Sequence, residues 1–361
     1  MASGFASFAA VNDTALHVAV SQNIIEALVQ DSLFLDGLGV TQVVTNDMGA
    51  GSVRVPKLKV ATGNFRKLGA TTNGGWYDTG SISAIGMDEE LIDLLYVYDL
   101  AEDVPVSQQA LSLGGASNVL NRAKMIGKKI ALGMNGGTLA TMLVANINAV
   151  IAASGTETGY IYTYSAGTSG SAYSSFVQAC AGLDDGDTYN NYFPYEGRLA
   201  LIRSVFETEL KTVTTNVFLG GSNFAQDMRA SGTLSPNAVL PEIKNGWRGL
   251  LNGVPCFLAS QAVWDQAEDW MCVASTHAAV SSGYLTNIVA VVCSHIATLR
   301  GHAIPESTKV IDAPTGQGVR IQPLSNFGCA TVFPKGVKLI AKAAFTEGSD
   351  ALEVLPPSSQ S

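Results

Sequence analysis

The sequence predicts an α+β fold from three observations. Apolar residues recur at helical spacing in 13–28 and again in 107–153. Apolar and polar residues alternate in two stretches of 46–105, which is typical of strands. Short apolar runs separated by turn residues then fill 271–355, and these indicate further strands. With 361 residues the chain is long enough for two or three compact units.

The composition excludes some functions. Hydrophobic residues make up 47% of the chain and charged residues only 14%, well below the roughly 25% of an ordinary soluble protein. The formal net charge of −9 argues against a protein whose main role is to bind nucleic-acid phosphates. A weakly charged chain with 37 glycines is typical of a protein that covers its surface with copies of itself.

The sequence argues against secretion and against a membrane span. No Lys or Arg occurs in residues 1–53, so we expect no signal peptide. The longest apolar stretch, 284–299, is interrupted by polar residues and is shorter than the ~20 residues that cross a bilayer. We expect this stretch to form one or two buried strands.

The five cysteines are predicted to be buried, reduced thiols. Their odd number and wide spacing fit neither a metal site nor a dense disulfide framework. Most have apolar neighbours, as small hydrophobic residues do. They are Cys180, Cys256, Cys272, Cys293 and Cys329.

The N-terminal segment, 1–45, is predicted to be an arm with a short helix. Asp13 suits the N-cap, and Leu16, Val20, Ile24 and Leu28 follow at helical spacing. Because a short helix is marginal by itself, we expect a neighbouring subunit to order it.

Residues 46–105 are predicted to form a long β-hairpin. A strand pattern runs through Gly51–Pro56, a turn signal follows at Asn73-Gly-Gly, and a second extended run includes Ile92 and Tyr98. A hairpin of this length is not stable alone, so it is expected to pack on a neighbour.

The charges of this hairpin are divided between its two arms. The basic residues are Arg54, Lys57, Lys59, Arg66 and Lys67. The acidic residues are Asp78, Asp88, Glu89, Glu90, Asp93, Asp99, Glu102 and Asp103. Two interpretations stand equally: the bases and acids pair across the hairpin, or they complement charges on neighbouring subunits.

Two helices are predicted in 107–153. The first has a basic face formed by Arg122, Lys124, Lys128 and Lys129. Met134-Asn-Gly-Gly is a stop signal, so a second helix is expected over 138–153. Beyond it the sequence predicts helices at 171–183 and 205–210, a strand over 195–204, and a turn followed by a strand over 250–260.

Catalytic signatures are missing from the sequence. It holds no nucleophile elbow, phosphate-binding loop or dinucleotide fingerprint. His17, His277, His295 and His302 show no metal-binding spacing, and His295 and His302 are read as structural. Asp184, Asp185 and Asp187 could bind a cation, but a solvated turn is the better interpretation because a calcium loop needs a later glutamate. We therefore expect no catalytic residues, no metal and no cofactor.

Four segments, taken in their order along the chain, resemble the major capsid protein of tailed double-stranded DNA phages. They are Gly51–Pro56, Glu196–Arg203, Asn245–Ser260 and Asn326–Pro334. The same fold recurs in the herpesvirus capsid floor and in encapsulin shells. The resemblance covers nearly the whole chain.

The resemblance implies a division of the chain into five parts. These are an N-terminal arm (1–45), an extended hairpin loop with flanking strands (46–105), a peripheral domain with a long spine helix (106–155), a central axial domain (156–270), and a returning β-rich segment that completes both domains (271–361). The candidate contacts between subunits are then charged residues already named. They are Arg54, Lys57, Lys59, Arg66 and Lys67, the acids Glu89, Glu90 and Asp93, and the bases Arg122, Lys124, Lys128 and Lys129.

The function implied by the resemblance is structural. The chain would assemble with itself into hexamers and pentamers of an icosahedral head that encloses double-stranded DNA without sequence-specific binding. Portal and scaffolding proteins are the implied partners, and a decoration protein is allowed. The protein would be found in the virion and, before assembly, in the host cytoplasm. Two alternatives remain: an encapsulin-like shell around a cargo enzyme, and an enzyme without a recognisable motif.

Overall fold

The structure is a computed structural model of the whole chain. The residues that it describes are 14–44, 52–58, 87–93, 96–99, 102–104, 115–153, 159–168, 170–187, 190, 192–211, 246–302, 307–312, 319–343, 350–357 and 360.

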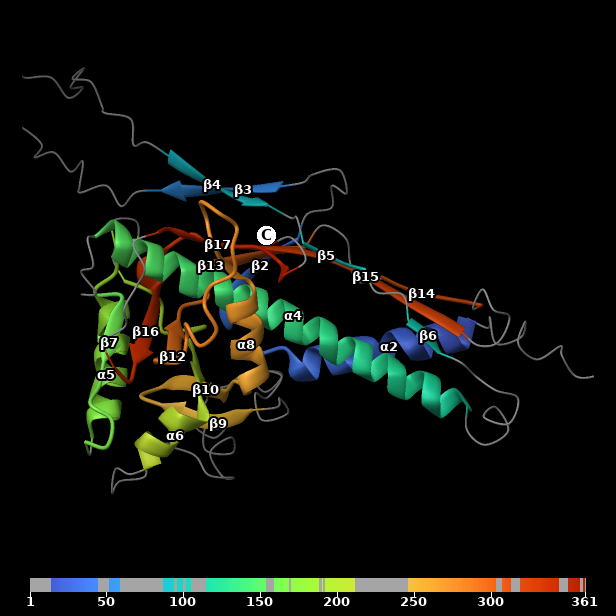
Figure 1. The fold of residues 1–361 in the computed structure, drawn as a ribbon, viewed down its shortest axis with the longest axis horizontal. Coiled ribbons are helices and arrows are strands. Elements are labelled where there is room, and N and C mark those ends of the chain that lie inside the picture. Colours follow the sequence, from blue (N-terminus) through green and yellow to red (C-terminus); the bar gives the residue numbers. More distant parts are fainter. Residues whose placement is uncertain are drawn as a thin grey trace, which may run out of the picture.

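A single long helix, α4 (Gly115–Ala152), crosses the molecule diagonally in Figure 1. The prediction of a break at Met134-Asn-Gly-Gly is therefore wrong. A Cβ on Gly136 would lie 2.5 Å from the Gln266 side chain, and one on Gly137 would lie 3.1 Å from the Trp270 ring. The two glycines let other elements approach the helix closely, and this packing offsets their cost of roughly 1 kcal/mol each in a helix interior.

The N-terminal helix is α2 (Thr14–Asp31), which lies against the first half of α4. Val20, Ile24 and Leu28 are buried in the same core cluster as α4, so the predicted helix and its apolar face are confirmed. The expectation that a neighbouring subunit orders this helix is wrong for residues 14–31, because α4 of the same chain buries it. Two short strands, β1 (Leu35–Asp36) and β2 (Gly39–Val44), follow α2.

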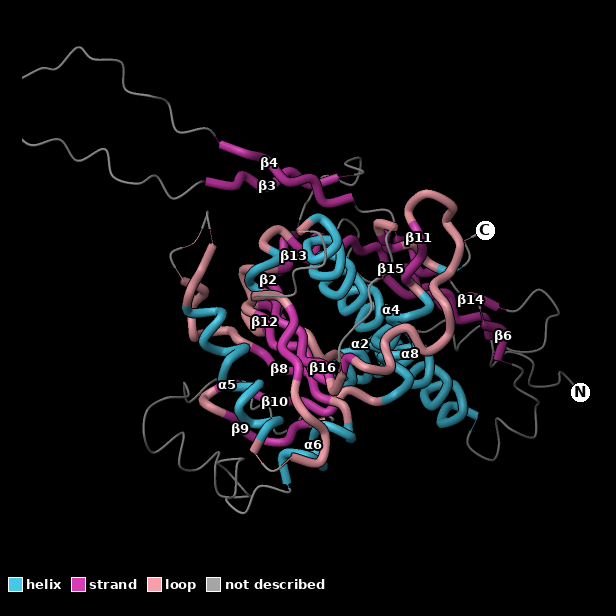
Figure 2. Tube along the Cα trace, turned by 60° about the vertical axis from the view of Figure 1, so that its left-hand side comes forward, coloured by secondary structure: helices cyan, strands magenta, loops and turns pink. Residues whose placement is uncertain are grey.

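A six-stranded sheet forms the centre of one half of the molecule (Figure 2). Its strands, in spatial order, are β7 (Ile161–Thr163), β16 (Val337–Ala341), β12 (Ile288–Cys293), β8 (Leu199–Ile202), β10 (Val254–Leu258) and β9 (Trp247–Leu251). The predicted strand over 195–204 is shorter than expected, because the residues before Leu199 form turns.

Helices cover both faces of this sheet. Leu199, Leu201 and Val291 point into the core cluster that contains α4, whereas Ala200 and Val292 point into a second cluster on the opposite face. That second cluster contains α5 (Ser171–Asp184) and α6 (Ser204–Lys211), which confirms the two helices predicted there. The alternation follows from the two-residue period of a strand.

A seven-stranded sheet lies on the side of α4 away from α6 and the β9–β10 end of the six-stranded sheet (Figure 1). Its main path runs β1-β2-β13-β15-β14, and β5 and β6 also pair with β15. The strands not yet given are β13 (Thr298–His302), β14 (Ser307–Asp312), β15 (Val319–Thr331), β5 (Tyr96–Asp99) and β6 (Glu102–Val104). β12 and β13 together confirm the one or two buried strands expected in 284–299.

The predicted hairpin is present as β3 (Ser52–Leu58) paired antiparallel with β4 (Met87–Asp93). Its second arm is shorter than predicted. β5 and β6 leave the hairpin and join β15, because the 13-residue β15 offers them an antiparallel partner.

Two elements close the fold beside α4. Helix α8 (Gln261–Asp269) packs on the middle of α4, and β11 (Met271–Val273) pairs with the C-terminal strand β17 (Leu352–Val354). Val119–Ala152 of α4 is long and apolar enough to cross a membrane, but 78% of its apolar window is buried inside the protein. The burial is that of a core helix.

Candidate functional site

The first half of α4 and the whole of α2 form a two-helix arm. The helices run in the same direction, since Ile24 lies beside Gly127 and Asp31 lies beside Asn135. A Cβ on Gly127 would be 2.5 Å from the Ile24 carbonyl oxygen, so only glycine permits the helices to approach this closely.

Asn135 fixes the end of α2 against α4. Its side chain is buried, its Oδ1 accepts the Leu33 backbone N–H at 3.0 Å, and its Nδ2 donates to the Asp31 carbonyl oxygen at 2.8 Å. Both polar ends of the amide are therefore satisfied. They bind the Asp31 carbonyl oxygen, which the end of α2 leaves without an intrahelical partner, and the N–H of Leu33 just beyond the helix.

The four bases predicted on α4 are all exposed on the outside of this arm. Successive helical residues are about 100° apart, so Lys124 and Lys128 lie on one flank, whereas Arg122 and Lys129 lie on the other. Met125 lies between the flanks, and its side chain is 52% exposed. The structure thus divides the predicted basic face into two pairs.

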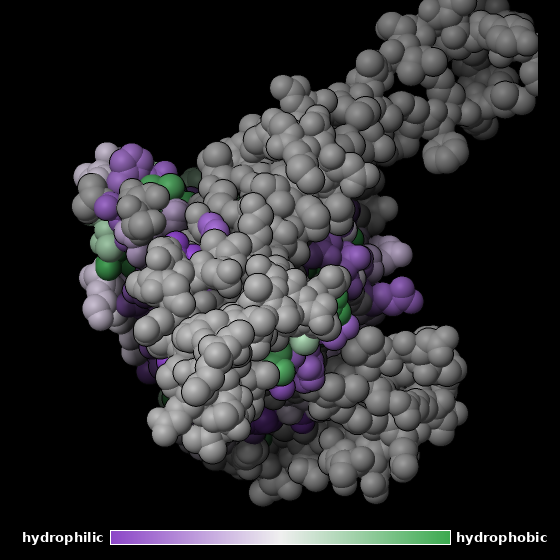
Figure 3. Space-filling view, turned by 90° about the vertical axis from the view of Figure 1, so that its right-hand side faces the viewer, coloured by the Kyte–Doolittle hydropathy of each residue, from purple (hydrophilic) through white to green (hydrophobic). Residues whose placement is uncertain are grey.

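The arm also carries an exposed apolar stripe that sequence reasoning missed. It consists of Val18, Ile25 and Val29 of α2, each 46–47% exposed. Their spacing of seven and four residues, opposite the buried Val20 and Ile24, is the signal that could have revealed it. Figure 3 views the molecule from the right-hand side of Figure 1 and shows hydrophobic and hydrophilic residues side by side on the described surface.

The flank of Lys128 leads into a half-open pocket of about 490 Å³. Its walls come from α4, from the end of α2, from the hairpin formed by β9 and β10, and from the start of α8. The side chains that define its chemistry are Leu33, Lys128, Leu132, Arg248, Leu258 and Val263, with Asp31 also on the wall. Arg248 donates from Nε to the Glu207 carboxylate at 3.1 Å.

The register between β3 and β4 determines which charged residues of the hairpin stand opposite each other. Lys57 stands opposite Asp88. Glu89, Glu90 and Asp93, the three acids predicted as contacts between subunits, stand opposite Pro56, Val55 and Ser52, none of which is basic; Arg54 stands opposite Leu91. In this register Asp88 is the one acid of β4 directly opposite a base, and a base lies diagonal to each of the other three.

The hairpin lies apart from the α2/α4 arm in both Figure 1 and Figure 2. Outside its own pair, β4 contacts β15 and β13. Three of the predicted contact residues, Lys59, Arg66 and Lys67, lie outside the described residues.

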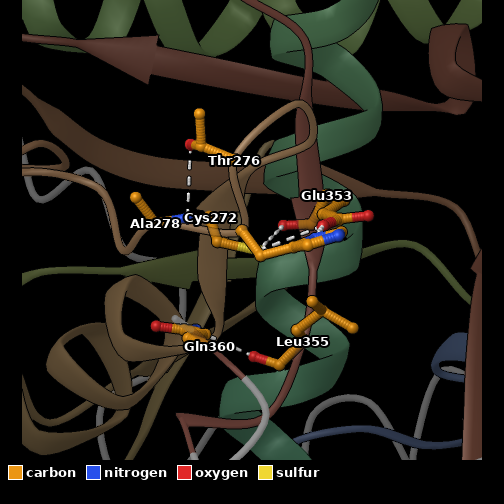
Figure 4. Close-up of polar contacts among 7 residues, drawn as sticks. Cys272, Thr276, Ala278, Glu353, Leu355 and Gln360 are labelled. Carbon is orange, nitrogen blue, oxygen red and sulfur yellow. Dashed lines mark hydrogen bonds and ion pairs between the residues drawn. The ribbon is translucent and has the colours of Figure 1, made fainter.

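The C-terminal strand β17 is tied to the body by side chains (Figure 4). Asn148 of α4 donates to the Leu352 carbonyl oxygen and accepts its N–H, at 2.7 and 2.8 Å. The Glu353 carboxylate contacts His277 Nδ1 and accepts the Cys272 thiol at 3.6 Å. Burial and the nearby Glu353 raise the pKa of Cys272 to about 11. The thiol therefore stays protonated at neutral pH, which suits a structural tie and makes it a poor nucleophile.

The acidic loop after α5 has a structural partner. Arg198 is buried and donates to the Asp184 carboxylate at 2.6 Å, while Tyr195 donates its hydroxyl to the same carboxylate at 3.0 Å. Among the described residues no three His, Cys, Asp or Glu side chains are grouped so that they could hold a metal ion.

Burial shifts the pKa values of several thiols and of one lysine toward their neutral forms. All five cysteines are free thiols that form no disulfide bond. Four of them are buried as predicted, and Cys329 is partly buried. Burial raises the pKa of Cys293 to about 12 and that of Cys180 to about 11. Burial lowers the pKa of Lys338 to about 8, and its ammonium donates to the Gly159 carbonyl oxygen at 2.6 Å.

The fold was compared with known proteins. No protein-family model and no curated protein matches the sequence. The capsid of Ralstonia phage GP4 matches the structure with a TM-score of 0.52 at 12% identity, over 88% of this chain and 91% of that chain. The chain has the fold of phage capsid proteins. The capsid structure of cyanophage P-SCSP1u agrees, with a TM-score of 0.51 at 13% identity over 84% of this chain and 86% of that chain.

The similarity to the capsid-protein fold extends over most of the chain. The match extends over 84–88% of this chain and 86–91% of the two matched chains. On this fold the chain carries two basic flanks on α4, an apolar stripe on α2 and the pocket beside Lys128.

Proposed function

We propose that this chain is the structural subunit of a closed phage-head shell. The observation that carries the proposal is the match of its fold, over nearly its full length, to two phage capsids. The chain would assemble into hexamers and pentamers of an icosahedral head enclosing double-stranded DNA. Its role is structural rather than enzymatic, in keeping with the protonated, poorly nucleophilic state of its buried thiols.

The acids of the hairpin are proposed to meet the bases of α4 on a neighbouring subunit. Glu89, Glu90 and Asp93 have no base directly opposite them, and the hairpin lies apart from the arm of its own chain. Oppositely charged segments that lie apart within one chain favour contact between copies. Arg54, Lys57, Lys59, Arg66 and Lys67 remain proposed contacts of the same hairpin.

The assembled head would also engage other molecules. A portal protein and a scaffolding protein are proposed partners, and a decoration protein is compatible with the fold. The net charge of −9 suits a container for DNA, because a strongly basic lumen would retain the genome. The site of action is the virion, with the host cytoplasm before assembly.

Electron microscopy and sedimentation of the purified full-length chain test this function. We expect closed shells or free capsomers, and nucleic acid inside particles recovered from an infected host. A chain that sediments as a monomer at high concentration and physiological salt would contradict the proposal. Shells that hold a cargo enzyme and no nucleic acid would favour an encapsulin-like compartment instead.

A further inference from the structure

We propose that Asn252, in the turn between β9 and β10, is a site of spontaneous deamidation, at which the side-chain amide is lost through a cyclic imide formed with Gly253. The modification needs no enzyme and no partner, because both reacting groups lie in the turn and water completes the reaction. The inference is independent of the proposed function.

The turn places the Asn252 amide beside an unhindered backbone nitrogen. Leu251 pairs with Val254 across the hairpin, so Asn252 and Gly253 alone form the loop, and the N–H of Gly253 lies outside the ladder of the two strands. Both residues have a positive φ, 50° and 77°, as the central residues of a type I′ turn do. Both are exposed, and a Cβ added to Gly253 would meet nothing within 4 Å.

These two groups can react without a catalyst. The amide nitrogen of Gly253 gives up its proton and attacks Cγ of Asn252. The new N–C bond forms as the bond from Cγ to Nδ2 breaks, and Nδ2 leaves as ammonia with that proton. Water then adds to one of the two carbonyl carbons of the ring and opens it to aspartate or isoaspartate, with no oxidation or reduction. Glycine favours the first step, because it carries no side chain beside the attacking nitrogen.

One contact restrains the Asn252 side chain. Burial raises the pKa of the Cys180 thiol to about 11, and a hydrogen bond with Asn252 acts in the opposite direction. A thiol is a weak hydrogen-bonding group, so this single contact holds the amide only loosely. It slows the attack without closing the site.

The chain contains its own control at Asn135 and Gly136. The sequence has four Asn–Gly bonds, at 73, 135, 245 and 252, and the structure describes both residues of the second and the fourth. Asn135 is buried within α4, and both ends of its amide are hydrogen-bonded. A Cβ on Gly136 would lie 2.5 Å from the Gln266 side chain, so the space beside this bond is filled. Ring closure at Asn135 requires the helix to open, whereas at Asn252 the exposed turn need only rearrange locally.

Peptide mapping of the full-length folded chain tests the assignment. The chain is kept at mildly alkaline pH in water enriched in the heavy oxygen isotope, and it is then digested at acidic pH so that handling causes no further loss of amide. Ring opening in this water labels the peptide that contains the new carboxylate. We expect the label to accumulate at Asn252 at least about tenfold faster than at Asn135, with isoaspartate among the products.

Two controls accompany the measurement. Asn252→Gly removes the amide from a turn that two glycines can also form, so its peptide should gain no label. In urea the helix is lost, and Asn135 should then react as fast as Asn252. Equal rates at the two sites in the folded chain would place the reaction in unfolded molecules and overturn the inference, as would an Asn252 that keeps its amide. Aspartate as the only product would overturn the route through the imide. None of these outcomes bears on shell assembly, so the proposed function is tested separately.

Discussion

Single glycines in α4 determine how closely its neighbours pack. Gly127 faces the backbone of α2, where an added Cβ would meet the Ile24 carbonyl oxygen at 2.5 Å, whereas an added Cβ on Gly133 meets nothing within 4 Å. The two glycines occupy the same helix but differ in their surroundings, which makes them a matched pair.

Alanine substitutions at these two positions should have opposite effects on stability. Gly127→Ala is expected to lower the free energy of unfolding by about 1–3 kcal/mol, because the helices must move apart. Gly133→Ala is expected to raise it by roughly 0.5–1 kcal/mol, since alanine favours the helix and meets no obstacle. Urea unfolding of the unassembled chain measures both. Equal shifts of the same sign would contradict the close contact at Gly127.

Lys338 gives the second prediction at this scale. Its pKa is lowered to about 8 in the folded state from 10.5, chiefly by burial and next by Lys335. Between these two pH values the unfolded chain binds the proton and the folded chain does not. The free energy of unfolding should therefore rise across this window, by on the order of 3 kcal/mol in total.

A methionine variant isolates this titration. Lys338→Met keeps the packing and removes the buried charge, so its advantage over wild type should be greatest below pH 8 and should disappear above pH 10.5. The control is Lys342→Met, which makes the same change at a partly exposed lysine just after β16. The measurement is unfolding by urea at a series of pH values. Parallel curves for wild type and Lys338→Met would show that the ammonium is not destabilised.

At the scale of elements, the two flanks of α4 offer a charge-matched comparison. Lys124→Glu with Lys128→Glu reverses the flank that enters the pocket, and Arg122→Glu with Lys129→Glu reverses the other flank by the same charge. Both double variants should keep the helical circular dichroism signal, because all four residues are exposed.

Only the first flank is expected to affect assembly strongly. Light scattering should show that Lys124→Glu with Lys128→Glu needs about tenfold more subunit to assemble at low salt. High salt should reduce the difference by screening the charges. Adding Glu89→Lys and Glu90→Lys should restore assembly. Two flanks with equal effects would indicate a response to net charge alone.

At the scale of the whole molecule, α2 belongs to the core of its own chain. Deleting residues 1–31 removes Val20, Ile24 and Leu28 from the main cluster and exposes the side of α4 that they cover. The free energy of unfolding should fall by on the order of 5 kcal/mol or more, and the chain should aggregate. Deleting residues 1–13 keeps every described member of this cluster and should keep the unassembled chain folded, as thermal unfolding with circular dichroism would show. A soluble, folded chain without residues 1–31 would contradict this view of α2.

Local patterns in the sequence were sufficient for much of the fold. The α+β class, the helices α2, α5 and α6, the buried strands in 284–299 and the β3–β4 hairpin all have a periodicity or turn signal within a few residues. The exposed bases of α4 were likewise predictable, because a helix places residues three and four apart on one face.

Contacts between distant residues decided the rest. Met134-Asn-Gly-Gly reads locally as a stop, yet Gln266 and Trp270 pack on its glycines and Asn135 binds the end of α2, so the helix continues. β5 and β6 found their partner in β15, more than two hundred residues away. The pocket combines side chains from α2, α4, β9, β10 and α8, and no local pattern joins them. Local residue patterns were enough to establish which segments are helical or extended and which α4 charges are exposed, because these properties depend on neighbours along the chain. The continuation of α4, the packing of α2 and the position of the pocket required the folded structure, because these depend on free energies of packing between segments far apart in sequence.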